Sequence, residues 1–321
     1  MKLSVFGVVL GNQTLDEACA FLQSKGVQAM EVGCGGYPGK AHCDPAVLLN
    51  DEQKLRAFQE TFRRHGLEIA ALSVHGNPVH PDASIAKAYH DDFVSAVLLA
   101  QKLGIRRIVG FSGCPGGSAL DKTPNWITCA WPPDFSAALQ YQWNDVLIPY
   151  WKQTAAFAAA HGIEKIALEM HPGFCVYNPS SLLRLREAVG EIIGANFDPS
   201  HLFWQGIDPV MAIRELKGAV HFFHAKDTRL DSANIARNGV LDTGAYANLS
   251  QRSWSFRTVG YGHSQLEWNN IVSELRVNGY DDVLSIEHED GLMSGNEGLC
   301  KAIRFLQDVL MFEDRGTMYW A

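Results

Sequence analysis

The stretch LSIEHEDG, residues 284 to 291, is a short apolar run followed directly by charged side chains. The apolar part ends at Ile286, and Glu287, His288, Glu289 and Asp290 come next. A short apolar run bounded in this way is typical of a buried strand. The charges that follow predict either a solvated turn or one corner of a binding site, and the rest of the chain decides between these two interpretations.

Seven further apolar runs precede this one, and each is followed by a stretch with helical periodicity. Eight strand–helix units joined by right-handed crossovers close on themselves. The sequence therefore predicts an α/β fold, a single-domain (β/α)8 TIM barrel over residues 1–321, with a doubly wound open sheet as the alternative. The predicted strands cover residues 3–9, 27–32, 68–73, 107–111, 165–169, 192–197, 220–224 and 283–287. The predicted helices cover residues 15–25, 51–65, 84–103, 137–160, 180–188, 209–216, 266–278 and 297–310.

Three strand-to-helix connections, residues 33–50, 112–136 and 225–265, are too long to be simple turns. In a barrel such connections lie at the carboxyl face of the strands, where active sites are built. We therefore predict long loop insertions at that face, at residues 112–136 and 225–265. The second insertion far exceeds the roughly two to six residues of an ordinary βα loop, which indicates a lid that selects the substrate.

Charge and cysteine content exclude several classes of protein. The formal net charge is −8, from 27 basic and 35 acidic residues, which argues against a nucleic-acid partner. The seven cysteines are scattered, without a C-x-x-C pair, as is usual in a reducing compartment. No apolar run approaches the roughly 18 residues of a membrane span. We expect a cytoplasmic protein without a membrane partner, and homo-oligomerisation stays open.

Four successive predicted strands carry one polar side chain each where they end: Glu169, Asp198, His224 and Glu287. Neighbouring strands lie about 4.8 Å apart, so these side chains can converge on one cation. Three carboxylates and an imidazole favour Mn²⁺, Mg²⁺ or Co²⁺ over a thiolate-selecting metal, with Zn²⁺ as a further alternative. A divalent cation would also remove the repulsion between the carboxylates. Each residue could instead be a solvated strand end or a helix cap.

The segments LEMHPG, FDPSH, HFFHAKD, VGYG and LSIEHEDG occur in this order, on the last four predicted strands or just before a helix. With these motifs the chain resembles, over nearly its whole length, the sugar phosphate isomerase/epimerase superfamily of xylose-isomerase-like TIM barrels. The resemblance implies one divalent metal ion, commonly Mn²⁺. The same four strand-end residues would hold it: Glu169, Asp198, His224 and Glu287. The resemblance also implies that Glu169 and Glu287 act as acid and base on the substrate.

The chain departs from two branches of the superfamily. Ketohexose epimerases carry a second glutamate six residues past the first, where this chain has Cys175, and an arginine six residues past the metal histidine, where it has Leu230. These departures argue against a free ketohexose as substrate. The related apurinic-site endonucleases need three zinc ions and an Asp-x-His motif, which Asp227-Thr228-Arg229 breaks.

Further residues near the predicted strand ends are candidate substrate contacts: His201, Arg257, His171, His75, Lys226 and Asp227. Arg257 could replace the absent arginine, because a guanidinium group can hold two oxygens of a sugar or a carboxylate. The structural alternatives are buried or loop histidines, a Lys226–Asp227 salt link, and an arginine that anchors the long loop to the rim. Tryptophans on the rim loops could stack on sugar rings or could fill the barrel mouth: Trp126, Trp131, Trp204 and Trp254.

These features predict an enzyme, a divalent-metal-dependent isomerase or epimerase that acts on a carbohydrate or polyol-derived α-hydroxy ketone through a cis-enediolate. The alternative is a lyase of the same superfamily, which dehydrates an inosose or cleaves a 3-oxo-glycoside. A third interpretation is a metal-holding subunit without catalysis, for which loss of a ligand would be the indication. None of the four ligands is lost.

Overall fold

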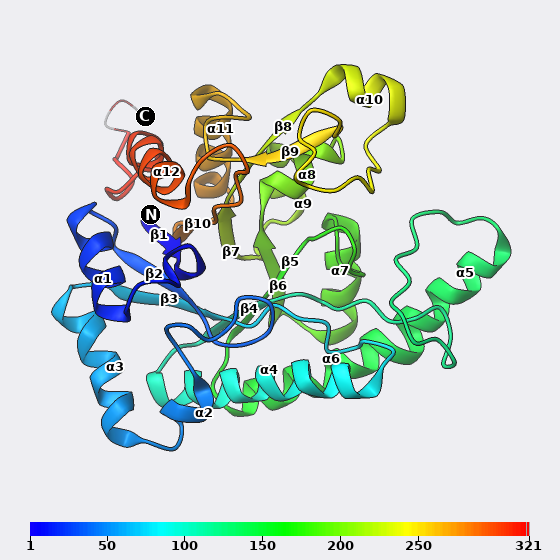
Figure 1. Ribbon diagram of the computed structural model, residues 1–321, viewed down its shortest axis with the longest axis horizontal. Coiled ribbons are helices and arrows are strands. Elements are labelled where there is room, and N and C mark those ends of the chain that lie inside the picture. The colour runs from blue at the N-terminus through cyan, green and yellow to red at the C-terminus, as the bar shows by residue number, and fades with distance from the viewer. Residues whose placement is uncertain (319, 321) are drawn as a thin grey trace.

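The computed structural model describes residues 1–318 and 320, and its centre is a closed barrel of eight parallel strands (Figure 1). The strands run in the order β1-β10-β7-β6-β5-β4-β3-β2, and β1 pairs with both β2 and β10, which closes the ring. The predicted (β/α)8 TIM barrel is therefore confirmed, and the open sheet is wrong. The barrel strands are β1 (Lys2–Phe6), β2 (Ala29–Gly33), β3 (Glu68–Ser73), β4 (Arg107–Gly110), β5 (Lys165–Glu169), β6 (Ile193–Phe197), β7 (Val220–Ala225) and β10 (Val283–Ile286).

Helices surround the barrel and follow its strands along the chain (Figure 1). Many begin at a side-chain cap: Thr14, for example, accepts a hydrogen bond from the backbone N–H of Glu17. None of the helices in the described residues is both long and apolar enough to cross a bilayer. The helices are α1 (Leu15–Ser24), α2 (Pro45–Leu48), α3 (Glu52–Arg64), α4 (Ala83–Leu103), α5 (Pro133–Gln140), α6 (Ile148–Ala160), α7 (Pro179–Val189), α8 (Pro199–Trp204), α9 (Pro209–Glu215), α10 (Ser232–Asn238), α11 (Gln265–Val277) and α12 (Gly295–Val309).

The predicted helix at residues 137–160 is divided into three parts. A π-helical segment, Tyr141–Leu147, separates α5 from α6. Pro149 stands in the first turn of α6 and has no N–H to donate, so the regular hydrogen-bond ladder cannot continue through this point. Figure 1 shows that α5 and the loop before it extend away from the barrel.

The long insertion at residues 225–265, which we call the lid, has secondary structure of its own. Its first strand, β8 (Asp227–Leu230), pairs antiparallel with β9 (Trp254–Arg257), and α10 lies between them in the chain. Figure 1 shows this hairpin and α10 beyond the end of the barrel, next to α8. The lid therefore consists of a two-stranded sheet and a short helix at one side of the barrel mouth.

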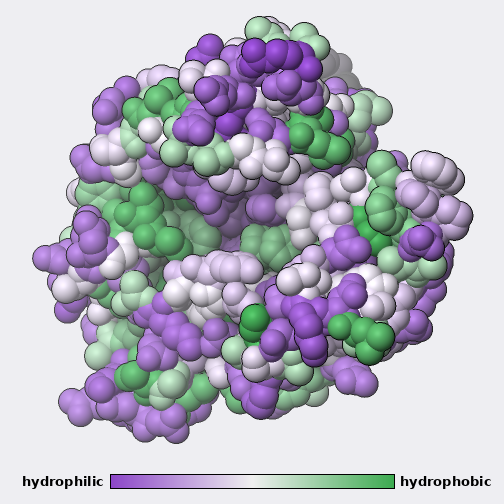
Figure 2. All heavy atoms as spheres, turned by 45° about the vertical axis from the view of Figure 1, so that its right-hand side comes forward, coloured by the Kyte–Doolittle hydropathy of each residue, from purple (hydrophilic) through white to green (hydrophobic). Residues whose placement is uncertain are grey.

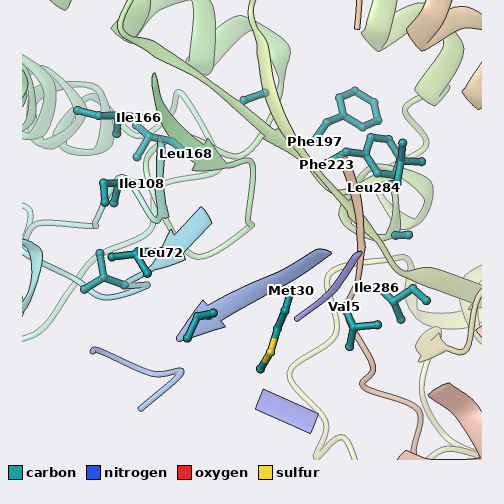
Figure 3. Packing of buried hydrophobic residues seen from close by; sticks show 14 of the residues in the cluster. Val5, Met30, Leu72, Ile108, Ile166, Leu168, Phe197, Phe223, Leu284 and Ile286 are labelled. Carbon is teal, nitrogen blue, oxygen red and sulfur yellow. The ribbon is translucent and has the colours of Figure 1, made fainter. Parts of the chain in front are cut away.

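Alternation along the strands decides which side chains face the barrel interior. Val5, Met30, Ile166, Phe223 and Leu284 belong to the large apolar core between strands and helices (Figure 3). Because successive strand side chains point to opposite faces, the residues between these outward ones point into the barrel. A second, smaller cluster of buried apolar residues is made up of Ala29, Ala70, Ala71, Val109, Ala167, Phe222 and Val283. The polar residues at the carboxyl ends of the strands lie above it.

Candidate metal centre

The four predicted ligands come together at the carboxyl end of the barrel. Glu169 ends β5, Asp198 caps α8 directly after β6, His224 lies on β7, and Glu287 follows β10. Each offers one ligand atom, and these four atoms all lie within 4.8 Å of one another. Asp198 and His224 are fully buried and Glu169 nearly so, whereas the side chain of Glu287 keeps 18% exposure.

Glu31 is a buried carboxylate at this centre that the sequence analysis missed. It lies on β2 between the outward-facing Met30 and Val32, so its side chain enters the barrel. The Nε2 atom of His224 lies 3.0 Å from both carboxylate oxygens of Glu31, and the Ser285 hydroxyl donates to the same carboxylate at 2.7 Å. A glutamate in an otherwise apolar strand was the signal available in the sequence.

The pairing with Glu31 decides how His224 presents its other ring nitrogen. Since a carboxylate only accepts, Nε2 carries the proton, and Nδ1 lies 3.1 Å from Glu169 Oε2 and 3.3 Å from Glu287 Oε2. A carboxylate that holds one ring nitrogen while the other faces the metal is the usual arrangement of a ligating histidine. Burial lowers the pKa of His224, but Glu31, Glu287 and Glu169 together hold that pKa well above its ordinary value.

Glu169 is held by several donors. Asn196 donates to its Oε2 at 3.0 Å, and His201 Nε2 lies 3.0 Å from Oε1. His75 Nε2 lies 3.3 Å from Oε2. Burial alone would raise the pKa of Glu169, but the neighbouring rings of His201, His224 and His75 hold it well below its ordinary value. The predicted substrate contacts His201 and His75 thus both lie against this proposed ligand.

Lys226 inserts its ammonium group among the carboxylates. Its Nζ lies 2.6 Å from Glu287, 3.0 Å from Glu289 and 3.1 Å from Asp198, and the side chain is buried. Burial opposes the charge, but Asp198, Glu287 and Glu289 hold the pKa of Lys226 well above its ordinary value. The predicted Lys226–Asp227 salt link is wrong, because Lys226 pairs with these three carboxylates whereas Asp227 accepts hydrogen bonds from the backbone of residues 260–263.

The donor set fits a divalent cation. Asp198 Oδ2 and His224 Nδ1 are buried, and neither has an aligned hydrogen bond to any described residue, although Lys226 Nζ approaches the former. Buried polar atoms without hydrogen bonds are costly, and a coordinated cation would satisfy both. Carboxylate oxygens and one imidazole nitrogen suit Mn²⁺, Mg²⁺, Co²⁺ or Zn²⁺.

Glu31→Gln tests the proposed orientation of His224. We expect Mn²⁺ affinity to fall by roughly 10- to 100-fold, as is usual when the partner of a ligating histidine is lost. Isothermal titration of Mn²⁺ measures it, and Glu68→Gln serves as the control because Glu68 is exposed and pairs with Lys2. Equal affinity in Glu31→Gln and wild type would mean that Glu31 does not position a ligand.

A cavity of about 450 Å³ opens beside the four ligands, and Glu287, His75 and His171 contribute polar groups to it. Figure 2 shows a hollow on one face of the molecule, where hydrophilic and hydrophobic residues meet. Burial lowers the pKa of His171 to about 3, so its ring is neutral at physiological pH. Its Nδ1 donates to the carbonyl of Pro172 at 2.6 Å, which leaves Nε2 as an acceptor. Aromatic residues also line the cavity, and they include Phe6, Tyr37, Phe111 and Phe174.

Asp227, a predicted substrate contact, is buried away from this cavity. Its Oδ2 accepts hydrogen bonds from the backbone N–H groups of Gly260, Gly262 and His263 at 3.0 to 3.1 Å. A Cβ atom at Gly262 would lie 2.3 Å from the Thr228 carbonyl oxygen, so the turn requires glycine there. Asp227 thus anchors the tight turn at residues 260–262.

Arg257 ends β9 in the lid and contacts Asp290, which lies after β10. Its Nε donates to Asp290 Oδ2 at 3.0 Å, and the backbone N–H of Thr258 donates to the same oxygen at 2.9 Å. Arg257 is buried and is absent from the residues that line the 450 Å³ cavity. This geometry favours the anchoring role over the substrate-binding role.

Arg257→Lys should therefore destabilise the protein and leave substrate binding unchanged. A lysine cannot keep the Nε bond to Asp290, and hydrogen bonds to charged groups contribute about 1.5 to 3 kcal/mol. We expect a melting temperature a few degrees lower by differential scanning calorimetry, with Arg56→Lys, on an exposed helix face, as the control. A normal melting temperature combined with a raised KM would instead assign Arg257 to the substrate.

Residues 19–309 match the sequence profile described as "Xylose isomerase-like TIM barrel". The chain belongs to this family. The uncharacterized protein YfiH of Bacillus subtilis (strain 168) is 37% identical over 312 residues, which cover 97% of this chain and 99% of that protein. The similarity to YfiH thus extends over nearly the whole of this xylose isomerase-like barrel.

Several solved structures share the fold. The probable 3-DHS dehydratase AsbF of Bacillus anthracis has a TM-score of 0.67 and 18% identity over 96% of this chain and 99% of its own. The IOLI protein with a bound zinc atom has a TM-score of 0.65 and 18% identity over 97% of this chain and 98% of its own. D-psicose 3-epimerase in the presence of D-fructose has a TM-score of 0.63 and 14% identity over 97% of this chain and 99% of its own. At these identities the likeness shows the fold of the xylose isomerase-like barrel.

Proposed function

We propose that this xylose isomerase-like barrel is a divalent-metal-dependent isomerase or epimerase of a carbohydrate or polyol-derived α-hydroxy ketone. One observation carries the proposal: the ligand atoms of Glu169, Asp198, His224 and Glu287 lie within 4.8 Å of one another beside a cavity large enough for a sugar. Mn²⁺ is the proposed metal, and Mg²⁺, Co²⁺ and Zn²⁺ are the alternatives. The zinc atom bound by the IOLI protein supports a cation in this fold.

The two glutamates are suited to move a proton between the faces of a substrate. When bound, the cation supplies a Lewis acid that acidifies the C–H between a carbonyl and a hydroxyl. Glu169 ends β5 and Glu287 follows β10, and β6 and β7 lie between these strands in the barrel. The glutamates therefore approach the substrate from different sides, so that one removes the proton and the other returns it through a cis-enediolate. Glu287 borders the cavity, and Glu169 adjoins it through His75, whose Nε2 lies 3.3 Å from Glu169 Oε2.

Other residues hold the substrate and the glutamates in place. His75 and His171 border the cavity, and neutral His171 presents Nε2 as an acceptor for a substrate hydroxyl. His201 positions Glu169 through its hydrogen bond to Oε1. The Lys226 ammonium group, 2.6 Å from Glu287, keeps that carboxylate ionised. From the same position it can stabilise an oxyanion that develops on the substrate next to Glu287.

A lyase activity is the second candidate, and the residues at two positions favour it. Cys175 and Leu230 replace the second glutamate and the arginine of ketohexose epimerases, and Leu230 is 41% exposed at the end of β8. The same enediolate can expel a leaving group next to it, which would dehydrate an inosose or cleave a 3-oxo-glycoside. The description of AsbF as a probable 3-DHS dehydratase supports this second candidate.

A substrate panel separates these activities. The protein is incubated with ketoses, inososes and 3-oxo-glycosides, with Mn²⁺ or with EDTA, and products are identified by NMR. A stereoisomer or an aldose formed only with Mn²⁺ supports the isomerase or epimerase, whereas an unsaturated or cleaved product assigns the lyase. Equal conversion with EDTA would contradict the metal dependence, and no conversion of any compound would favour a non-catalytic subunit.

A further inference from the structure

A second cavity of about 190 Å³ adjoins the proposed metal centre on the side of the lid. His171 is common to the linings of both cavities. His201, which hydrogen-bonds the ligand Glu169, contributes to the same wall. The rest of the wall comes from α8 and from both long insertions, including Trp126 of the first and Tyr246 of the second. This second cavity is therefore a neighbour of the candidate active site.

Aromatic rings form much of the wall of the second cavity, and Asp242 and Thr243 also border it. The rings of Trp204 and Trp254 stack at 4.7 Å between centroids with 5° between their planes, and Tyr246 and Phe256 stack at 6.0 Å and 14°. Trp204, Trp254 and Phe256 form an apolar cluster separate from the barrel core. Such satellite clusters often hold a long loop down, and these rings do join the lid to α8. The same rings also border an open space beside the metal centre.

Two hydrogen-bond donors of this wall have no protein partner. The indole N–H groups of Trp126 and Trp204 are buried, and neither finds an acceptor among residues 1–318 and 320. Buried indole N–H groups ordinarily have a partner, so a ligand with acceptor oxygens would complete both. A volume near 190 Å³ is below the roughly 300 to 1,000 Å³ that enclose drug-sized ligands, so one ring fits better than a chain.

We propose that this cavity is a subsite for a second sugar ring, and that the substrate is therefore a glycoside whose ketone-bearing unit lies at the metal centre. Aromatic faces pack against the C–H face of a pyranose, and the two indole N–H groups donate to its hydroxyl or ring oxygens. An aryl group would use the aromatic faces but would leave the donors without acceptors. The inference rests on the proposed function, because it names the substrate class of the same site.

The test compares the binding of cellobiose, glucose and phenyl β-glucoside to the Mn²⁺-loaded protein by isothermal titration. Cellobiose should bind roughly two to ten times more tightly than glucose, as expected for stacking of one further ring. Tyr246→Ala should remove this advantage and leave glucose affinity unchanged; Tyr246 is 59% exposed, so the fold should tolerate the change. The control is Trp131→Ala, since Trp131 is 77% exposed and borders neither cavity.

A second variant tests the role of the indole N–H donors in the second cavity. Trp204→Phe keeps an aromatic ring but removes one unpaired N–H, so it should weaken cellobiose binding and spare phenyl β-glucoside. Equal affinity for cellobiose and glucose in the wild type, or an undiminished preference in Tyr246→Ala, would overturn the subsite. Tighter binding of phenyl β-glucoside than of cellobiose would overturn the assignment to a sugar ring.

These measurements do not depend on turnover, so the two proposals can fail separately. A cellobiose preference that Tyr246→Ala removes, in a protein that converts no ketone of the substrate panel, would sustain the subsite and refute the enzyme activity. Turnover of single-ring ketoses without any cellobiose preference would sustain the activity and refute the subsite.

Discussion

Asp198→Ala and His224→Ala should each reduce bound Mn²⁺ from about one ion per chain to an undetectable level. Each change removes one of four ligands whose atoms lie within 4.8 Å of one another. Both positions are at the carboxyl rim of the barrel, where residues contribute to function more than to stability, so the fold should survive. Elemental analysis after dialysis measures the metal, and circular dichroism measures the fold.

The two substitutions differ in their side effects. His224→Ala removes the imidazole partner of the buried Glu31 carboxylate and leaves only the serine hydroxyls as donors, which should cost about 1 to 3 kcal/mol of stability. Asp198→Asn is a further variant with fewer side effects, because asparagine keeps the shape of the side chain and removes only its charge. His221→Gln is the matched control, since His221 lies at the other end of the same strand and contacts the Glu191 carbonyl. Full metal occupancy in both Asp198→Ala and His224→Ala would refute the metal centre.

Glu169→Gln and Glu287→Gln should each lower turnover by a factor of about 10² or more, even at saturating Mn²⁺. Glutamine keeps an oxygen for the cation but cannot accept or return a proton. The measurement is kcat for the compound that the substrate panel identifies, with metal content determined on the same samples. Glu164→Gln is the control, because Glu164 pairs with Arg106 on the surface and belongs neither to the ligand set nor to the cavity lining.

The outcome of these two variants can also separate the glutamates. Glu287 borders the cavity and Glu169 is enclosed by His75, His201 and His224, so Glu169→Gln should disturb the metal centre more. If both glutamine variants, saturated with Mn²⁺, turned the substrate over at the wild-type rate, the proton-transfer roles would be wrong.

The barrel was predictable because its signals are local. Each strand is a short apolar run, and each helix has its own periodicity and caps, so eight units could be counted without any knowledge of pairing. The four ligands were predictable for the same reason: parallel strands end at one rim, and Glu169, Asp198, His224 and Glu287 stand where four runs end. Their convergence follows from topology.

Contacts between distant segments were not predictable. Glu31 and His224 are 193 residues apart, and only closure of the barrel brings β2 opposite β7. The pairing of β8 with β9 likewise joins two four-residue strands across the lid, and neither strand has an apolar run that marks it. The aromatic walls of both cavities come from residues of many elements, so single motifs did not indicate them.

Alternation along a strand would have corrected one interpretation. Lys226 follows His224 by two residues and so shares its inward direction, whereas Asp227 points outward to the turn at residues 260–262. The same rule places Glu31 inside the barrel.

Deuterium exchange tests the central claim most directly. The protein is incubated in D₂O with the compound identified in the substrate panel, and NMR follows deuterium at the carbon between the carbonyl and the hydroxyl. We predict incorporation that requires Mn²⁺, stops with EDTA and is lost in both Glu169→Gln and Glu287→Gln. Conversion of the compound with no deuterium at that carbon, or incorporation that persists without the metal, would contradict the account.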